Sequence, residues 1–231
     1  LFGIYARFRP KRQQDTPMAI VCFDPVTGAS GDMILGALFD LGASVDRVRG
    51  ALASTGIEGF ELSFSRTASA PNHIQCGRCE VTTEDQASHR HLPEIYEILG
   101  RADVSATVRG QAETIFRRLA EAEAAVHGIG IEKVHFHEVG ALDTIVDVLG
   151  ACVALDDLGA EHVYNSGFKV GTGTVTCSHG TLPLPAPATA KLIEGSPVTR
   201  LDLPAELTTP TGAAILSTLS EGDWSGIRMR L

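Results

Sequence analysis

The stretch Ala141–Gly159 (ALDTIVDVLGACVALDDLG) has the length of a helix and carries apolar residues around most of its circumference. A helix that is apolar on most sides must be covered on most sides, so this stretch is expected to lie at the centre of the fold. Two acids, Asp143 and Asp147, lie four residues apart on one face of it. Like charges at this spacing destabilise a helix by about 0.2–0.5 kcal/mol, and burial raises the cost.

A cation bound between Asp143 and Asp147 would remove this cost. The alternative is that the two carboxylates cap backbone groups or pair with a distant arginine. The residues just before the helix favour the cation, because Val134–Glu138 reads VHFHE. In an extended segment, His135 and His137 point to the same face. Imidazole and carboxylate together suit a transition metal, so the sequence predicts a metal or catalytic site here.

Other histidines could add ligands. His89-Arg90-His91 repeats the two-residue spacing just before a predicted helix that starts with Pro93 and Glu94, and His179 lies in a later loop. A lone histidine such as His179 is more often structural than a ligand. The predicted metal ligands are His89, His91, His135, His137, Glu138, Asp143, Asp147 and His179.

A second kind of site is predicted near the start of the chain. A short strand at Ala19–Phe23 is followed by the loop DPVTGASG and by a helix from about Asp32 to Leu41, with Ser30 as its N-cap. A strand, a glycine-containing loop and a helix start form an anion site, although the P-loop lysine is absent. Asp24 and Asp32 could hold a divalent cation that bridges to a phosphate, and the alternative is a simple capped turn.

A similar helix start recurs near the end of the chain. The sequence ELTTPTG (206–212) precedes a predicted helix at Ala213–Leu219, with Thr209 as N-cap and Pro210 at the first helical position. Its hydroxyls could bind phosphate or simply cap the helix. The predicted phosphate or nucleotide ligands are Asp24, Ser30, Gly31, Asp32, Thr208, Thr209, Thr211 and Gly212.

The remaining patterns complete an α/β fold in the broad sense, a mixed sheet with packed helices whose strand order the sequence does not give. Alternating residues predict two antiparallel strands, and apolar periodicity predicts three more helices. The strands are expected at 60–67 and 74–83, and the helices at 44–54, 104–126 and 188–194. We expect residues 1–17 to be an extension outside the fold, and 18–231 to form one or two subdomains with a possible break near 84–90.

The composition argues against several kinds of binding partner and of protein. The net charge of −9 disfavours nucleic acid and anionic membranes as partners. No run of eighteen apolar residues occurs, so no transmembrane helix is expected. Five cysteines, an odd number, argue against a disulfide framework and for the cytoplasm, and the lone pair Cys76 and Cys79 is a weak metal or redox signal. We also expect a homo-oligomer.

Five segments, in this order, resemble the nickel-insertion proteins of nickel-pincer cofactor assembly, the LarC family. They are DPVTGASGDMILGALFDLG (24–42), HRHL (89–92), the stretch 120–158 that contains VHFHEVGALDTIVD, HGTLPLPAPAT (179–189) and ELTTPTGAA (206–214). The resemblance covers about residues 19–219, the N-terminal portion of family members. SGDM and HFHEVGALD are its most distinctive parts.

The resemblance implies an activity. Family members insert Ni²⁺ into pyridinium-3,5-bisthiocarboxylic acid mononucleotide, forming two nickel–sulfur bonds and one nickel–carbon bond, with CTP and Mg²⁺ or Mn²⁺. Such a nickel chelatase is a cyclometallase of the lyase class. A proton must leave the ring carbon, so a base is needed near the metal, and His137, Glu138 and Asp143 are the candidates.

This chain departs from the family pattern in two ways. Many members carry a histidine-rich insertion before HRHL, where this chain has EDQAS, so bulk nickel storage is not expected. Family chains also continue into a C-terminal domain associated with nucleotide use, which we expect to be absent here. A separate C-terminal half, or the apo form of the nickel-pincer enzyme, is then an expected partner. Two alternatives stay open: a non-catalytic module that binds and delivers nickel, and a metal-dependent hydrolase.

Overall fold

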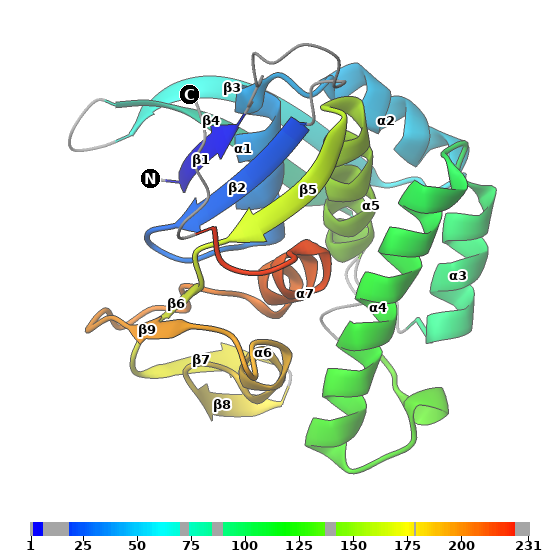
Figure 1. Ribbon diagram of the computed structural model, residues 1–231. Helices are drawn as coiled ribbons and strands as arrows, with labels where there is room; N and C mark the ends of the chain where they lie inside the picture. The colour runs from blue at the N-terminus through cyan, green and yellow to red at the C-terminus, as the bar shows by residue number, and fades with distance from the viewer. Residues whose placement is uncertain are drawn as a thin grey trace.

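The computed structural model describes residues 2–6, 19–69, 74–84, 90–136, 142–177 and 179–224. Helix α5 (Leu142–Asp157) lies at the centre, in contact with helices α1, α2, α4 and α7 and with strands β4 and β5 (Figure 1). Almost every side chain of α5 is buried, which confirms that the apolar stretch is the core of the fold.

The helices around α5 follow the predicted pattern closely. Their N-caps include Ser44, Ser105 and Thr209, whose side chains each accept a hydrogen bond from a backbone N–H of the first turn. Helix α4 (Ala106–His127), predicted at 104–126, buries Val108, Ala112, Ile115, Phe116 and Leu119 and has Gly128 as its C-cap. The other helices are α1 (Gly31–Leu41), α2 (Val45–Ser54), α3 (Leu92–Arg101), α6 (Pro187–Leu192) and α7 (Pro210–Leu219), with a 3-10 turn at Ile131–Lys133.

In the described residues, the strands form a three-stranded mixed sheet and three two-stranded sheets, which confirms the α/β class. In the mixed sheet, β2 (Ala19–Pro25) pairs in parallel with β5 (Ala160–Asn165) and antiparallel with β1 (Phe2–Ala6). The predicted hairpin is present as β3 (Phe60–Ser69) and β4 (Ile74–Thr83). The remaining pairs are β6 (Phe168–Val170) with β9 (Val198–Arg200), in parallel, and β7 (Thr174–Cys177) with β8 (Gly180–Pro183), antiparallel.

Residues 1–17 were expected to lie outside the fold, whereas the structure describes Phe2–Ala6 as part of a sheet. These five residues form β1, which pairs with β2 from Val21 to Pro25. The edge of β2 offers backbone donors and acceptors to any extended neighbour, and FGIYA contains no residue that prevents extended pairing. Residues 7–17, and 85–89 within the predicted break, lie outside the described part of the chain.

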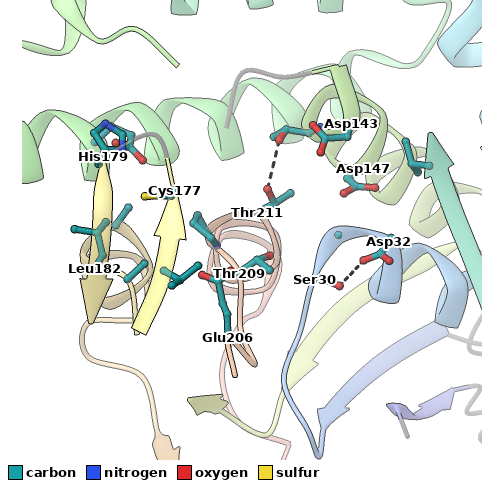
Figure 2. A pocket seen from close by; sticks show the side chains of 18 of the residues that line it. Ser30, Asp32, Asp143, Asp147, Cys177, His179, Leu182, Glu206, Thr209 and Thr211 are labelled. Carbon is teal, nitrogen blue, oxygen red and sulfur yellow. Dashed lines mark hydrogen bonds between the residues drawn. The ribbon is translucent and has the colours of Figure 1, made fainter. Parts of the chain in front are cut away.

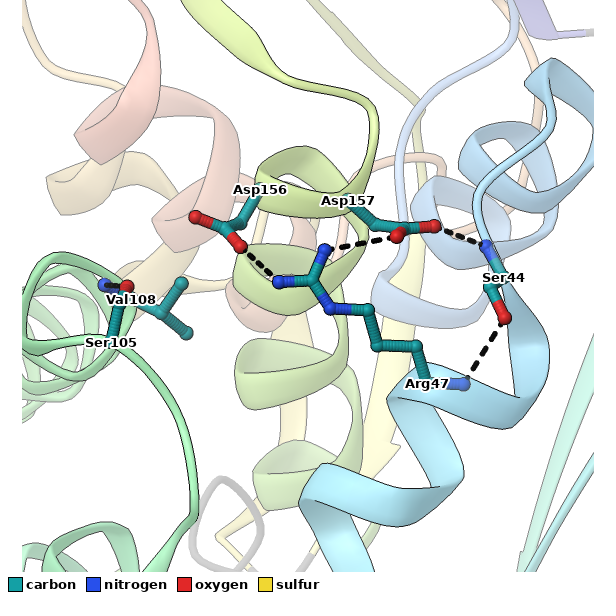
Figure 3. Close-up of polar contacts among 6 residues, drawn as sticks. All are labelled: Ser44, Arg47, Ser105, Val108, Asp156 and Asp157. Carbon is teal, nitrogen blue, oxygen red and sulfur yellow. Dashed lines mark hydrogen bonds and ion pairs between the residues drawn. The ribbon is translucent and has the colours of Figure 1, made fainter.

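An ion-pair cluster fastens α2 to the C-terminal end of α5 (Figure 3). The Arg47 guanidinium bonds the Asp156 carboxylate and lies 2.9 Å from Asp157 Oδ1, while the Ser44 backbone N–H donates to Asp157 Oδ2 at 2.7 Å. The hydrogen bond from Arg47 lowers the pKa of Asp157 most, and the bond from the Ser44 N–H lowers it further. The two acids at the end of α5 are therefore structural, in contrast to the two at its start.

Two further observations concern the cysteines and the possibility of a transmembrane helix. All five cysteines are free thiols. Within the described ranges, no helix combines the length and the apolar character needed to cross a bilayer.

Candidate functional site

Two helix starts that are far apart in the sequence lie side by side. Ala29 forms a parallel bridge with Thr208, in which the Ala29 N–H donates to Leu207 O at 2.9 Å and the Thr209 N–H donates to Ala29 O at 3.0 Å. The first residues of α1 and α7 follow this bridge directly. The bridge therefore aligns the N-terminal ends of both helices on the same cavity (Figure 2).

Glycines at two positions make this approach possible. A Cβ on Gly28, whose φ of +113° already favours glycine, would lie 1.8 Å from Leu207 O. A Cβ on Gly212 would lie 2.3 Å from Ala29 O. The glycines of TGASGD and TTPTG are thus required for backbone packing, in addition to any contact with a ligand.

The start of α5 adds two carboxylates to the lining of the same cavity. Asp143 is exposed in its first turn, and Asp147, one turn later, is only 8% exposed. Asp147 lies against the start of α1, because a Cβ on Gly31 would be 2.2 Å from Asp147 Oδ2. Among the residues that the structure describes, Asp147 Oδ1 has no hydrogen-bond partner, which is uncommon for a buried carboxylate.

The burial of Asp147 and the nearby acids change the pKa values of Asp147 and Cys79. Burial, then the neighbouring charges of Asp32 and Asp143, raises the pKa of Asp147 well above its ordinary value. Burial, followed by the charges of Asp147 and Asp32, also raises the pKa of Cys79 on β4 to about 12, so this thiol stays protonated. The charge of Asp32 therefore acts on Asp147 in addition to that of Asp143, which the sequence had paired with it.

These groups line a cavity of about 840 Å³, within the usual range for small-molecule sites. Arg78 is the only lysine or arginine among the described residues that line it, and it forms an ion pair with Glu80 at 2.6 Å. The acids in the wall are Asp32, Glu80, Glu123, Asp143, Asp147 and Glu206.

The opposite wall contains two histidines. His127, the last residue of α4, and His179, at the β7–β8 turn, have ring centroids 4.9 Å apart. Cys177 also lines this wall. His127 was not predicted, because its position at the end of a scaffold helix gave no signal in the sequence; only the fold places it beside His179.

The predicted phosphate ligands divide into two groups. Ser30, Gly31, Asp32, Thr209 and Thr211 line the cavity, and the Ser30 hydroxyl donates to the Asp32 carboxylate. The other three do not line it. Asp24 accepts a hydrogen bond from the Ser166 hydroxyl at 2.6 Å, Thr208 donates to Lys169 O at 2.6 Å, and Gly212 is buried against Ala29.

The predicted metal ligands also divide. Asp143, Asp147 and His179 line the cavity, whereas His91 and His135 do not and instead form a pair with ring centroids 4.0 Å apart. His89, His137 and Glu138 lie outside the described residues. In the described part of the chain, no three His, Cys, Asp or Glu side chains are grouped closely enough to hold a metal ion by themselves.

Comparison with known proteins identifies the family. The family model for nickel insertion proteins matches residues 21–230. A relative in Geobacter sp. (strain M21), whose name describes nickel insertion, is 46% identical over 207 residues, which are 89% of this chain and 53% of the relative. A relative of the same description in Dictyoglomus thermophilum is 42% identical over 203 residues, covering 88% of this chain and 52% of its own length.

A third relative has a more specific name. The pyridinium-3,5-bisthiocarboxylic acid mononucleotide nickel insertion protein of Staphylococcus saprophyticus is 40% identical over 193 residues, 84% of this chain and 49% of the relative. No solved structure shows a significant match. The chain spans about half the length of the curated relatives it matches. Because the family model covers nearly all of the chain, the chain belongs to the nickel insertion protein family.

Proposed function

We propose that this chain takes part in inserting nickel into pyridinium-3,5-bisthiocarboxylic acid mononucleotide, and that its cavity binds the phosphate of a nucleotide together with a divalent cation. The nucleotide is the pyridinium substrate or CTP. The observation that carries the proposal is Asp147, a buried carboxylate with an oxygen that has no partner in the described part of the chain, beside two aligned helix starts.

The residues present fit Mg²⁺ or Mn²⁺. Mg²⁺ prefers oxygen ligands, and proteins usually hold it with one or two carboxylates while substrate phosphates and water complete the shell. Asp32 and Asp147 supply such a pair, with Asp143 at the edge. A cation there would offset the mutual repulsion and the burial that raise the pKa of Asp147.

The phosphate would lie at the two helix starts. Backbone N–H groups in the first turn of a helix have no partners within the helix and attract anions. Ser30 and Gly31 on α1, and Thr209 and Thr211 on α7, bring such groups and hydroxyls to one wall. Arg78 adds a positive charge on the β4 side. A wall rich in carboxylates would repel a nucleotide without these contributions and the cation.

The proposed reaction consumes nickel as a substrate. Two sulfurs and one ring carbon of the pyridinium compound bond to Ni²⁺, and the carbon loses one proton, so no oxidant or reductant is required. A base near the carbon takes that proton. His137, Glu138 and Asp143 stay the predicted candidates. Of these, Asp143 lies on the cavity wall, where its carboxylate accepts a hydrogen bond from the Thr144 N–H at 2.7 Å.

The test is an assay for the nickel-pincer product with the pyridinium substrate, Ni²⁺, CTP and Mn²⁺, supplied with and without the C-terminal portion of a family member. We expect product with wild-type chain and at least a tenfold loss with Asp147→Asn. Nickel binding without product under both conditions would favour a delivery module instead. Full activity of Asp147→Asn would remove the observation on which the proposal depends.

A further inference from the structure

The two walls of the cavity have different metal chemistry. The wall formed by α1 and α5 offers only carboxylate oxygens, whereas the wall formed by the end of α4 and the β7–β8 hairpin offers the imidazoles of His127 and His179, the Cys177 thiol and the Glu123 carboxylate. Figure 2 shows His179 and Cys177 across the cavity from Asp32 and Asp147. Oxygen ligands suit Mg²⁺ and Mn²⁺, while imidazole suits nickel and its neighbours. The two walls would therefore favour different divalent cations.

The spacing of His127 and His179 fits one shared cation. Metal–nitrogen bonds are about 2.0–2.1 Å long, so two imidazoles on the same ion have ring centroids roughly 4.5–5.5 Å apart. The observed separation is 4.9 Å, with 43° between the ring planes. The rings of His91 and His135 are closer, at 4.0 Å, and His91 Nδ1 lies 3.0 Å from Val134 O, so this nitrogen of His91 is engaged with the backbone.

The setting of His127 also resembles that of a metal ligand. Ligating histidines commonly bond a carboxylate through the other ring nitrogen, which orients the ring. Here Glu123, one turn earlier on α4 and only 13% exposed, has its Oε2 3.5 Å from His127 Nε2. This contact leaves Nδ1 of His127 as the nitrogen available to a cation. Both imidazoles are exposed to the cavity, so a cation can enter from solvent.

We propose that His127 and His179 form a loading site for the nickel ion that is later inserted, separate from the carboxylate wall that holds the nucleotide-associated cation. The identity of the cation rests on the function proposed above. Only two protein ligands are needed, because cargo nickel must leave for the sulfurs of the substrate. The remaining coordination positions are filled by water until then.

The experiment adds Ni²⁺ alone to the whole chain. The imidazole C–H resonances of the histidines are assigned by NMR, and substoichiometric Ni²⁺ is titrated in, since the paramagnetic ion broadens or shifts only nearby protons. Calorimetry then compares wild type with the double variant His127→Ala/His179→Ala. The control is His162→Ala: His162 lies on β5, outside the cavity lining, with Nδ1 2.8 Å from Glu221 Oε1, so it matches His127 as a histidine beside a carboxylate.

We expect the resonances of His127 and His179 to respond at the lowest Ni²⁺ concentrations. The double variant should lose at least tenfold in affinity for that site, Glu123→Gln should lose a smaller factor, and His162→Ala should bind as wild type. A response confined to other histidines, or unchanged affinity in the double variant, would overturn the loading site.

Mn²⁺ binding with CTP should be unaffected by the double variant. If Mn²⁺ binding or product formation fails while nickel still binds this pair, the proposed function falls, and His127 and His179 remain a nickel-binding pair without the loading role.

Discussion

Gly31 at the start of α1 lies directly against the side chain of Asp147 on α5, so close that a Cβ on residue 31 would be 2.5 Å from Asp147 Cβ. The Cβ of Asp147 is fixed to the α5 backbone and cannot rotate away. Any side chain at position 31 must therefore move one helix relative to the other. The glycine in SGD sets the distance between the start of α1 and the carboxylate wall.

Gly31→Ala is expected to destabilise the protein despite its favourable helix propensity. Alanine is preferred to glycine within a helix by about 1 kcal/mol, but overpacking a close contact costs typically 1–3 kcal/mol. Gly50→Ala is the matched control, since Gly50 lies within α2 with no atom within 4 Å of a built Cβ, and it should be neutral or stabilising. Urea denaturation measures both. Equal stabilisation by the two changes would show that α1 and α5 separate easily.

The metal-free protein should become less stable as the pH rises through the titration of Asp147. The raised pKa means that the folded state keeps a proton which the unfolded chain releases near pH 4, so stability falls from there up through the folded-state pKa. Asn cannot ionise. Asp147→Asn should therefore melt at a higher temperature than wild type at pH 7 in the presence of a chelator, and the difference should shrink towards pH 4.

Asp157→Asn should change stability in the opposite direction to Asp147→Asn. The pKa of Asp157 is lowered by its bonds to Arg47 and to the Ser44 N–H, so its stabilisation is present at pH 7 and is lost as the pH falls through the folded-state pKa. This change should lower the free energy of unfolding at pH 7 by about 1 kcal/mol, an amount typical of a surface ion pair with one added hydrogen bond, and so lower the melting temperature. Thermal melts at pH 4 to 8 distinguish the two aspartates; a parallel pH profile for both would contradict the environments described here.

The segment VHFHE (134–138) predicts a separate contribution to the affinity for Ni²⁺. His135→Ala combined with His137→Ala should lower the affinity for Ni²⁺, because the two imidazoles share a face if the segment is extended. The fold should persist, since His135 is exposed. Calorimetry with Ni²⁺ tests this, and unchanged nickel binding in the double variant would remove the motif from the metal site.

Local patterns predicted most of the elements. Thr209 is the N-cap at which the sequence placed it, α2 begins within one residue of the predicted start at 44, and the alternation in β3 and β4 was sufficient for the hairpin. Patterns of this kind depend on residues a few positions apart, so they can be read along the chain. The role of Phe2–Ala6 as β1 could not be read in this way, because it depends on an edge that β2 offers.

The site was only partly predictable for the same reason. Asp143 and Asp147 stood out as a pair, but their exposures differ because one faces the cavity rim and the other the start of α1. The bridge between Ala29 and Thr208 joins segments about 180 residues apart, and no pattern within either segment indicates it. His127 gained a neighbour only through the return of the β7–β8 hairpin to the end of α4.

Asp32→Asn should weaken the divalent-cation site far more than the fold. Asp32 lies in the first turn of α1, where an acid contributes about 0.3–1 kcal/mol through the helix dipole, and its removal also relieves repulsion with Asp147. The stability of the metal-free variant should therefore stay within about 1 kcal/mol of wild type. With Mn²⁺ and CTP at about 100 times the dissociation constant, binding should add about 2.7 kcal/mol to wild type and much less to the variant.

Asp46→Asn is the control, since Asp46 is also an acid in a first turn, on α2, with a side chain 93% exposed and outside the cavity lining. It should lose the same small helix-dipole contribution and keep the full stabilisation by Mn²⁺ with CTP. Thermal melts of the three proteins, with and without the cation and the nucleotide, decide the outcome. If Asp32→Asn melts far below wild type without metal and still gains the full increment with it, Asp32 is a structural residue of α1 and the cation is held elsewhere.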